Sequence, residues 1–534
     1  MPKSHSLILA GLALTTVLAQ GAFAENLRYA GATAPLTFDP HATNDFVTTA
    51  IARQTYESLI ELNAKSQLVP GLATQWEYID NAAWRLTLRE GVTFHDGTPM
   101  TAEDVSFSIM RQASSPRYKS LFGQITEANV VDATTVDIVT AQPDAVMPVK
   151  LSLLFVMSKA WAEANDVVEV PDLGAASSES YSLRHANGTG PMKLELQVPG
   201  ERTVFVRNDD WWDDFTGNVD RAEYVAITSA PTRLAALLSG EVDLITDVPL
   251  QDVVRVEETA GFKVADGPQR LYMGLEMDGT RDVALASFDK NGQPLDSNPF
   301  KDVRVRRAIA LAIDNEAIVS RVMRGYARPI SMPAAPGFQG YAEDLEKDLG
   351  VDLEESKRLL AEAGYPDGFR TTLNCPLERY VNTEEICRAS ASLLARVGIE
   401  VTVNGMVWPE FARMLVNGPD SSFHLIGALG NSGDVQDVFG AILHTRDDES
   451  GLGQQNWAMW SNTDFDAVFE KLVSTFDPDE RAALYREGLR IAQEQQHAIY
   501  LHQPFLIWAM ADKVDASVRA DSAVVLSDVT VGTE

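Results

Sequence analysis

The sequence predicts an α/β fold divided into more than one domain, and three observations support this. The chain has 534 residues, which exceeds what one hydrophobic core usually serves. A strand, a turn and a capped helix follow one another within residues 84–111. Helical and strand-like segments then alternate along the chain, as is typical of layered α/β domains. With 45% hydrophobic and 22% charged residues, we expect a globular protein throughout.

The first of these units is the stretch LREGVTFHDGTPMTAEDVSFSIMR at residues 88–111. It follows residues 84–88 (WRLTL), which alternate as a strand does, and it contains the turn dipeptide Asp96-Gly97. Residues 101–104 (TAED) have the form of a capping box that opens a helix. Its acidic residues are therefore explained by capping and by the helix dipole.

The remaining elements are predicted from periodicity and from their cap and stop signals. Helices are expected at residues 231–240, 303–313, 315–324, 352–364, 384–397 and 478–496, and strands at residues 242–248, 371–374 and 399–403. Residues 498–510 form an apolar segment. We place crossings between domains near residues 269–274 and 500–505.

The N-terminus has the features of a secretory signal peptide. Lys3 gives a positive start, residues 7–19 are apolar, and Ala22-Phe23-Ala24 is a small-x-small cleavage site. The apolar run is shorter than the roughly 20 residues that a membrane span needs. No cysteine follows it, so we expect an exported protein cleaved near Ala24 that is not a lipoprotein, most simply in a bacterial periplasm.

The only two cysteines are Cys375 and Cys387. An oxidising compartment favours a disulfide between them, whereas two separate buried thiols are the alternative. The net charge of −32 disfavours nucleic acid and anionic lipid as partners.

Common catalytic and metal-binding patterns are absent from the sequence. There is no GxxxxGK[ST] phosphate loop, no HExxH, no GxSxG and no CxxC. The eight histidines show no paired ligand spacing, so each is better explained by packing or surface placement, and no metal or cofactor is expected. Carboxylates are too numerous for a catalytic pair to be picked by spacing, and no enzymatic activity is predicted.

Six segments, in order, resemble the extracytoplasmic solute-binding proteins of ATP-binding-cassette importers, specifically the peptide/nickel/opine-binding family 5. They are YESLIELNAKSQLVPGLATQWE at 56–77, LREGVTFHDGTPMTAEDV at 88–105, GTGPMKL at 188–194, LLSGEVD at 237–243, FKDVRVRRAIALAID at 300–314 and LLAEAGYPDGF at 359–369. The resemblance covers nearly the whole chain after the signal peptide.

The resemblance implies a two-lobed periplasmic-binding-protein fold of the large type II form, with an extra subdomain and a hinge of two crossing strands. It implies a signal peptide at 1–24, a first lobe at 25–269 that includes an inserted subdomain at about 56–184, a second lobe at 270–504, and a return to the first lobe at 505–534. The ligand is expected between the lobes, enclosed by hinge closure.

The resemblance also implies candidate ligand-binding residues. Arg379, in CPLERY, is similar to the arginine that holds the ligand carboxylate in dipeptide-binding members, and its fork suits two parallel hydrogen bonds; a surface arginine paired with Glu378 or Glu384 is the alternative. The other candidates are Trp408, Asn456, Trp457 and His502, which lie in segments that border the cleft in relatives.

The ammonium site departs from the family pattern. In GNSGDVQDVFG (430–440), Asn431 stands where relatives have the aspartate that binds the ligand α-ammonium, and Asp434 follows three residues later. A neutral amide does not compensate a buried ammonium. Either Asp434 takes over this role or the ligand lacks a free α-amine.

The leading hypothesis is a monomeric, non-enzymatic binding protein that delivers a short peptide, or a related amino-acid-derived solute, to membrane permease and ATPase subunits. A nickel chelate, an opine or a sugar-like solute is the alternative cargo. A secreted hydrolase and a chaperone are alternatives from other classes.

Overall fold

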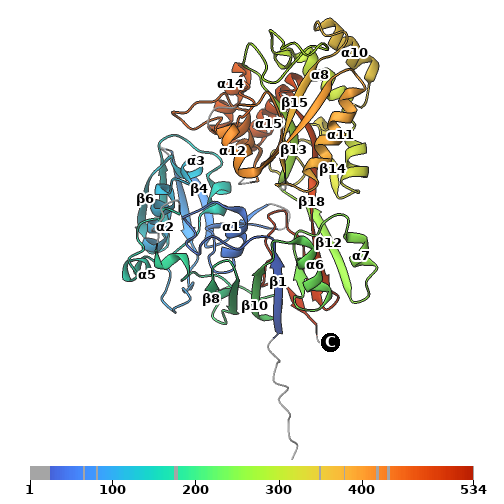
Figure 1. Ribbon diagram of the computed structural model, residues 1–534. Coiled ribbons are helices and arrows are strands. Elements are labelled where there is room, and N and C mark those ends of the chain that lie inside the picture. Colours follow the sequence, from blue (N-terminus) through green and yellow to red (C-terminus); the bar gives the residue numbers. More distant parts are fainter. Residues whose placement is uncertain are drawn as a thin grey trace, which may run out of the picture.

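Two α/β lobes, joined by the long strand β18 (Ala498–Ala511), make up the computed structural model (Figure 1). The structure describes residues 25–63, 67–79, 82–173, 179–347, 350–377, 379–416, 420–429 and 433–532. One sheet of 12 strands runs through both lobes. The first half of β18 pairs with β13 (Leu271–Met277) in the upper lobe, and the second half pairs with β12 (Phe262–Pro268) in the lower lobe. The chain therefore passes between the lobes at 268–271 and at 502–505.

The lower lobe is built around β1 (Glu25–Gly31), which lies parallel to its neighbours β10 (Val219–Ala226) and β11 (Leu244–Ile245). The sheet continues antiparallel through β9 (Arg202–Arg207) to β8 (Met192–Val198). Helices of this lobe outside the inserted region are α1 (Phe46–Ala52), α6 (Ala230–Leu238) and α7 (Val253–Glu257).

A separate antiparallel sheet, in the order β4-β5-β7-β6, lies between β1 and β8 in the sequence and beside the lower lobe in space (Figure 1). Its strands are β4 (Ala73–Ile79), β5 (Ala83–Leu88), β6 (Ile125–Asp132) and β7 (Thr135–Thr140), near a small pair formed by β2 (Ile60–Leu62) and β3 (Leu68–Pro70). Its helices are α2 (Ala102–Ser114), α3 (Lys119–Phe122), α4 (Met147–Lys150) and α5 (Lys159–Ala164).

The upper lobe contains the crossover unit that the sequence predicts. Strand β15 (Arg370–Leu377), helix α11 (Thr383–Ala395) and strand β16 (Glu400–Val407) follow one another, and the two strands are parallel. The other strands are β14 (Ala327–Pro329) and β17 (Phe423–Leu429). The other helices are α8 (Val303–Ala312), α9 (Asn315–Ala317), α10 (Leu353–Glu362), α12 (Trp408–Val416), α13 (Val435–Val438), α14 (Thr463–Val473) and α15 (Pro478–Gln495). The chain then returns to the lower lobe and ends with β19 (Val514–Asp515) and β20 (Thr530–Val531).

The capping prediction for the segment at 88–111 is confirmed. Thr101 caps α2 and accepts a hydrogen bond from the Asp104 amide, and the Asp104 carboxylate accepts one in return from the Thr101 amide at 2.9 Å. Asp352 likewise caps α10. The strand predicted at 242–248 is too long, because only Leu244–Ile245 pair and Asp247 adopts φ +57°, which turns the chain. The helix predicted at 315–324 is a short α-helix followed by a π-helical turn at Ile318–Val322.

The main hydrophobic core lies around the shared sheet and extends from α6 in the lower lobe to α8 and α11 in the upper lobe. A second core supports α13 to α15, and the inserted sheet has its own core under α2. Among the helices of the described residues, none is both long and apolar enough to cross a bilayer.

Candidate functional site

A cleft of about 780 Å³ lies where the two lobes meet. The lower lobe contributes α1 and the turn at Asp247, and the upper lobe contributes the loop after β15 and Trp408 at the start of α12. The two crossing segments form its floor, with Arg270 from one and His502 from the other. The volume is within the range of cavities that enclose small-molecule ligands.

Arg379 enters this cleft from the loop that follows β15. Its guanidinium carbon lies 4.5 Å from the ring centre of Trp408, a cation–π contact that fixes the direction of the side chain. No described carboxylate is close enough to form an ion pair with it. Glu384, one of the two partners considered from the sequence, instead pairs with Arg388, and Glu378 lies outside the described residues. The exposed guanidinium is thus oriented and available to an anionic group.

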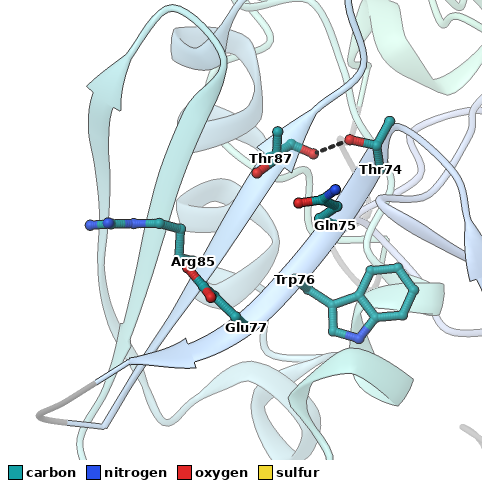
Figure 2. Close-up of a pocket in the computed structure, with 6 residues that line it drawn as sticks. All are labelled: Thr74, Gln75, Trp76, Glu77, Arg85 and Thr87. Carbon is teal, nitrogen blue, oxygen red and sulfur yellow. Dashed lines mark hydrogen bonds between the residues drawn. The ribbon is translucent and has the colours of Figure 1, made fainter.

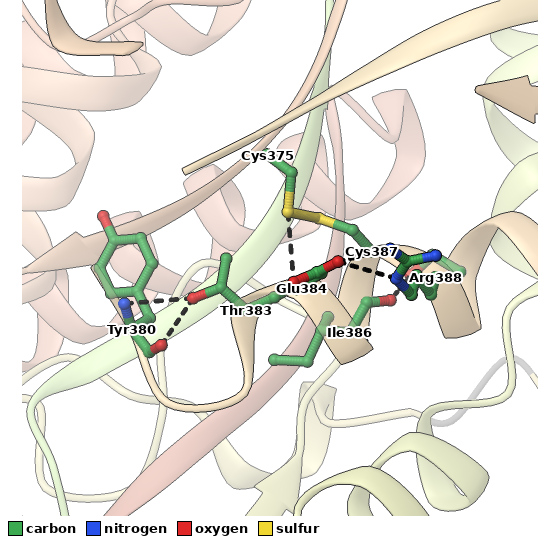
Figure 3. The surroundings of a disulfide bond; sticks show 8 residues. Cys375, Tyr380, Thr383, Glu384, Ile386, Cys387 and Arg388 are labelled. Carbon is green, nitrogen blue, oxygen red and sulfur yellow. Dashed lines mark hydrogen bonds and ion pairs between the residues drawn. A yellow bond between two sulfur atoms is a disulfide. The ribbon is translucent and has the colours of Figure 1, made fainter. Parts of the chain in front are cut away.

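The loop that carries Arg379 is held at its base by a disulfide (Figure 3). Cys375 on β15 and Cys387 on α11 are joined, with an S–S distance of 2.08 Å. Within the loop, the Thr383 hydroxyl donates to the Tyr380 carbonyl at 2.6 Å and accepts from the Tyr380 amide at 3.2 Å. These links between strand and helix restrict the loop and therefore the position of its arginine.

His502 lies at the crossing of β18 and lines the cleft. Its side chain is fully buried, and neither ring nitrogen has a hydrogen-bond partner among the described residues. Burial lowers its pKa to about 3, so the imidazole is neutral at physiological pH. A neutral imidazole supplies one donor and one acceptor, and no described residue uses either of them.

Arg270 is a residue that the sequence analysis missed. It begins the upper-lobe side of the first crossing and is only 7% exposed, yet it lines the cleft. Burial lowers its pKa, while the carboxylate of Asp521 opposes this shift, and the guanidinium remains protonated at neutral pH. The available signal was that Arg270 directly precedes the largely apolar run LYMGLEM at 271–277 and lies inside the predicted crossing at 269–274.

Three other predicted residues do not line the cleft. The Asp434 carboxylate accepts a hydrogen bond from the Gln436 amide at 2.7 Å as the cap of α13, and another from the Tyr485 hydroxyl at 2.6 Å. Burial raises the pKa of Asp434 to about 6, although the Tyr485 hydrogen bond opposes this. Asp434 is therefore a buried cap of α13 that contacts Tyr485 of α15, and it is not among the residues that line the cleft.

The Asn456 side chain braces its own loop by hydrogen bonds to the carbonyls of His444 and Trp460 and from the Trp460 amide. Trp457 packs against the same small cluster as Trp408, formed by Phe411, Leu415 and Ile426, without reaching the cleft. Asn431 lies outside the described residues. Its role stays a prediction.

The match to known proteins covers most of the chain. Residues 67–450 match the model for bacterial extracellular solute-binding proteins, family 5. The chain belongs to this family. It is thus an extracytoplasmic solute-binding component of an ATP-binding-cassette import system, which accounts for a cleft between two lobes joined by crossing strands.

Individual relatives of this solute-binding protein carry different names. The chain is 27% identical to heme-binding protein A of Haemophilus influenzae over 88% of this chain and 85% of the relative. It is 26% identical to the dipeptide-binding protein of Escherichia coli over 93% of each chain. Among solved structures, a periplasmic binding protein of Helicobacter pylori in complex with the peptide STSA superposes with a TM-score of 0.75 at 22% identity, covering 96% of this chain and 99% of that one.

A second hollow of about 400 Å³ lies on the inserted sheet (Figure 2). It is formed by β4 and β5, with Thr74, Trp76, Glu77 and Arg85 among its walls. Arg85 is already paired with Asp137 through two hydrogen bonds of 2.7 Å. The hollow is shallow and lies away from the crossing segments, so it is a weaker candidate for the solute site.

In the described part of the chain, no three histidine, cysteine, aspartate or glutamate side chains gather as metal ligands. The described side chains that line the cleft of this solute-binding protein include guanidinium, imidazole, carboxylate, amide, hydroxyl, aromatic and aliphatic groups.

Proposed function

We propose that this protein captures a short peptide, or a related amino-acid-derived solute, between its two lobes and delivers it to the permease and ATPase subunits of an importer. Arg379 carries this proposal. Its guanidinium is oriented by Trp408, has no described anionic partner and faces a cleft of suitable volume. Such a group is suited to a ligand carboxylate, since charge-assisted hydrogen bonds from arginine form in pairs.

The proposed mechanism is a shift between open and closed arrangements of the lobes. The solute contacts Arg379 and Trp408 of the upper lobe and the α1 wall of the lower lobe. It stabilises the closed form by as much as its affinity for the closed form exceeds its affinity for the open form. The crossings at 268–271 and 502–505 are the only covalent links between the lobes in the described residues, and we infer that they act as the hinge.

The proposed domain limits follow from this hinge. They are a signal peptide at 1–24 cleaved near Ala24, a lower lobe at 25–269 with its inserted subdomain at about 56–184, an upper lobe at 270–504, and a return at 505–534. The pairing of β18 with β13 up to His502, and with β12 from Phe505, supports the second crossing. We further propose a periplasmic, non-lipidated monomer without catalytic activity.

The ligand-free protein, prepared by unfolding and refolding, is tested by thermal shift. The solutes are di- and tripeptides, nickel with and without chelators, opines and sugars. A ligand at about one hundred times its Kd adds roughly 2.7 kcal/mol to stability, which is a readable upward shift. Arg379→Gln should weaken binding about 10- to 100-fold, since a hydrogen bond to a charged group contributes roughly 1.5–3 kcal/mol.

The matched control is Arg388→Gln, which removes an exposed arginine from the neighbouring helix α11. This variant should keep the wild-type response. A wild-type protein that responds to nickel chelates or sugars but to no peptide or amino-acid derivative would overturn the proposed cargo. Sustained turnover of a peptide above the blank would overturn the non-enzymatic assignment.

A further inference from the structure

Arg270 is a buried cation at the hinge, and no described acid forms an ion pair with it. Its side chain lines the cleft and is 7% exposed. Its backbone amide donates to the Ala520 carbonyl at 3.1 Å, but no described residue forms a hydrogen bond or an ion pair with its guanidinium. A buried charge of this kind is costly unless another group compensates it.

The neighbouring charges do not supply full compensation. Asp521 is the acid that most favours the charged form of Arg270, but its two oxygens are bound by Arg519 at 3.1 and 2.9 Å. Arg53, on the other side of Asp521, is bound to Glu61 at 3.3 Å. Asp437 also favours the charged form of Arg270, but among the described residues neither Asp437 nor Asp521 forms an ion pair with its guanidinium.

The acids of the lower-lobe wall are separate from this group. Asp45 caps α1 and accepts from the Thr48 amide and hydroxyl at 2.8 and 2.7 Å. Asp247 accepts from the Thr246 hydroxyl at 3.0 Å. Neither lies within ion-pair distance of Arg270.

The Arg270 guanidinium lies against Gly433, where a Cβ would be only 2.7 Å from Nη1. Gly433 belongs to the segment 430–440, in which the sequence analysis sought an acid for a ligand ammonium. The described part of this segment instead meets a cation. An ammonium placed here would be repelled, whereas a carboxylate would gain charge-assisted hydrogen bonds.

His502 lines the same cleft with two free ring nitrogens and lies in the adjacent crossing segment. As a neutral imidazole it donates one hydrogen bond without adding charge. The two crossing segments therefore bring a guanidinium and a neutral imidazole to the same cleft.

We propose that Arg270, assisted by His502, forms a second anion-binding subsite at the hinge, and that the solute is an amino-acid derivative with two carboxylates, one of which replaces the free α-ammonium of a peptide. This inference rests on the proposed function, because Arg379 holds the first carboxylate. The substituted amine end of the solute then points to the hinge floor, where Gly433 provides the space for Arg270.

The test uses three probes that differ only at the amine end: Ala-Ala with a free ammonium, N-acetyl-Ala-Ala with a neutral end, and N-succinyl-Ala-Ala with a second carboxylate. Isothermal titration of the ligand-free protein should show at least about 10-fold tighter binding of the succinyl probe than of the acetyl probe. Arg270→Met should reduce this ratio to within about 3-fold, because the succinyl probe loses much more affinity than the acetyl probe. Arg379→Gln should weaken both anionic probes.

The outcomes separate the two proposals. Tightest binding of free Ala-Ala, or equal weakening of both anionic probes by Arg270→Met, overturns the hinge subsite and leaves the proposed function intact. If the wild-type protein binds none of the probes, and Arg379→Gln does not change the response to any solute, the proposed function itself is overturned.

A measurement without ligand tests the same arrangement. Arg270→Met removes a buried charge that has no ion-pair partner among the described residues, and it keeps an unbranched apolar stem. The thermal midpoint of the ligand-free protein should therefore rise by about 2 °C or more. Arg388→Met, on an exposed position, should leave it unchanged. A fall in the midpoint of Arg270→Met would mean that the arginine serves the fold, which would overturn the proposal.

Discussion

The buried ion pair between Arg111 and Asp39 tests how the lower lobe is held together. Arg111, at the end of the motif at 88–111, donates to the two oxygens of Asp39 at 2.8 and 2.6 Å. Their side chains are 2% and 0% exposed. Asp39 also accepts from the Ser182 hydroxyl at 2.7 Å and from the His41 amide at 3.0 Å. The pair thus joins helix α2 of the inserted region to the segment after β1.

The perturbation is Asp39→Asn, which keeps the shape of the side chain and removes its charge. Burial alone would raise the pKa of Asp39, but Arg111 outweighs burial and holds the pKa below its usual value, so the native carboxylate is ionised. The variant leaves Arg111 charged and buried. Breaking such a pair costs about 3–5 kcal/mol, which corresponds to a fall in Tm of roughly 10 °C for a lobe of this size.

The assay is differential scanning calorimetry of the ligand-free protein, in which the lower-lobe transition is compared between variants. The double variant Asp39→Asn with Arg111→Met should recover at least half of the loss, since no charge is then left unpaired. Glu384→Gln is the control, because its pair with Arg388 is 46% and 69% exposed and should contribute less than about 1 kcal/mol. A loss of less than about 1 kcal/mol in Asp39→Asn, or a double variant as unstable as the single one, would show that the buried pair does not hold the lower lobe together.

Three further predictions concern stability. Burial raises the pKa of Glu57 from 4.5 to about 7, so the folded state binds more protons than the unfolded state between these pH values, and the free energy of unfolding should fall by up to about 3 kcal/mol as pH rises through them. Urea midpoints measured at pH 4.5 and 7.5 should therefore differ less in Glu57→Gln than in the wild-type protein. An equal difference in both proteins would contradict this prediction. Burial lowers the pKa of His502 from 6.5 to about 3, so the free energy of unfolding should fall as pH falls from 6.5 to 3. In acid titrations His502→Gln should lessen this loss by up to about 5 kcal/mol. Equal acid sensitivity of the variant and the wild-type protein would contradict this prediction. Replacing Cys375 and Cys387 by serine removes a disulfide across a sequence separation of 12 and should lower the free energy of unfolding by about 3 kcal/mol. The double variant should therefore have a lower Tm than the oxidised wild-type protein. An equal Tm would contradict this contribution.

Local signals in the sequence were sufficient where the side chains that define an element lie within that element. The capping box at Thr101–Asp104 and the Asp352 cap are determined by side chains within one helical turn, and both form as predicted. The crossover unit from β15 to β16 also follows from periodicity, because buried strands and amphipathic helices differ in their repeat. The resemblance then placed Arg379 on a loop that does border the cleft.

Residues whose roles depend on tertiary contacts were not predictable in this way. Asp434 has suitable spacing, but the nearby Tyr485 hydroxyl and the end of α13 use its carboxylate. Nothing in the local sequence shows that Arg270 is buried, because its burial depends on the crossing of the segments at 268–271 and 502–505. The strand at 242–248 is cut short by the left-handed turn at Asp247, which local propensity does not show.

We propose that an amino-acid-derived solute closes the two lobes through Arg379. Small-angle X-ray scattering on the ligand-free protein, with and without a saturating solute from the peptide and N-succinyl series, tests it directly. We predict a smaller radius of gyration for the wild-type protein on binding and no change in Arg379→Gln at the same solute concentration. An unchanged radius in a wild-type protein that calorimetry shows to be saturated, or equal contraction in both proteins, would contradict the account.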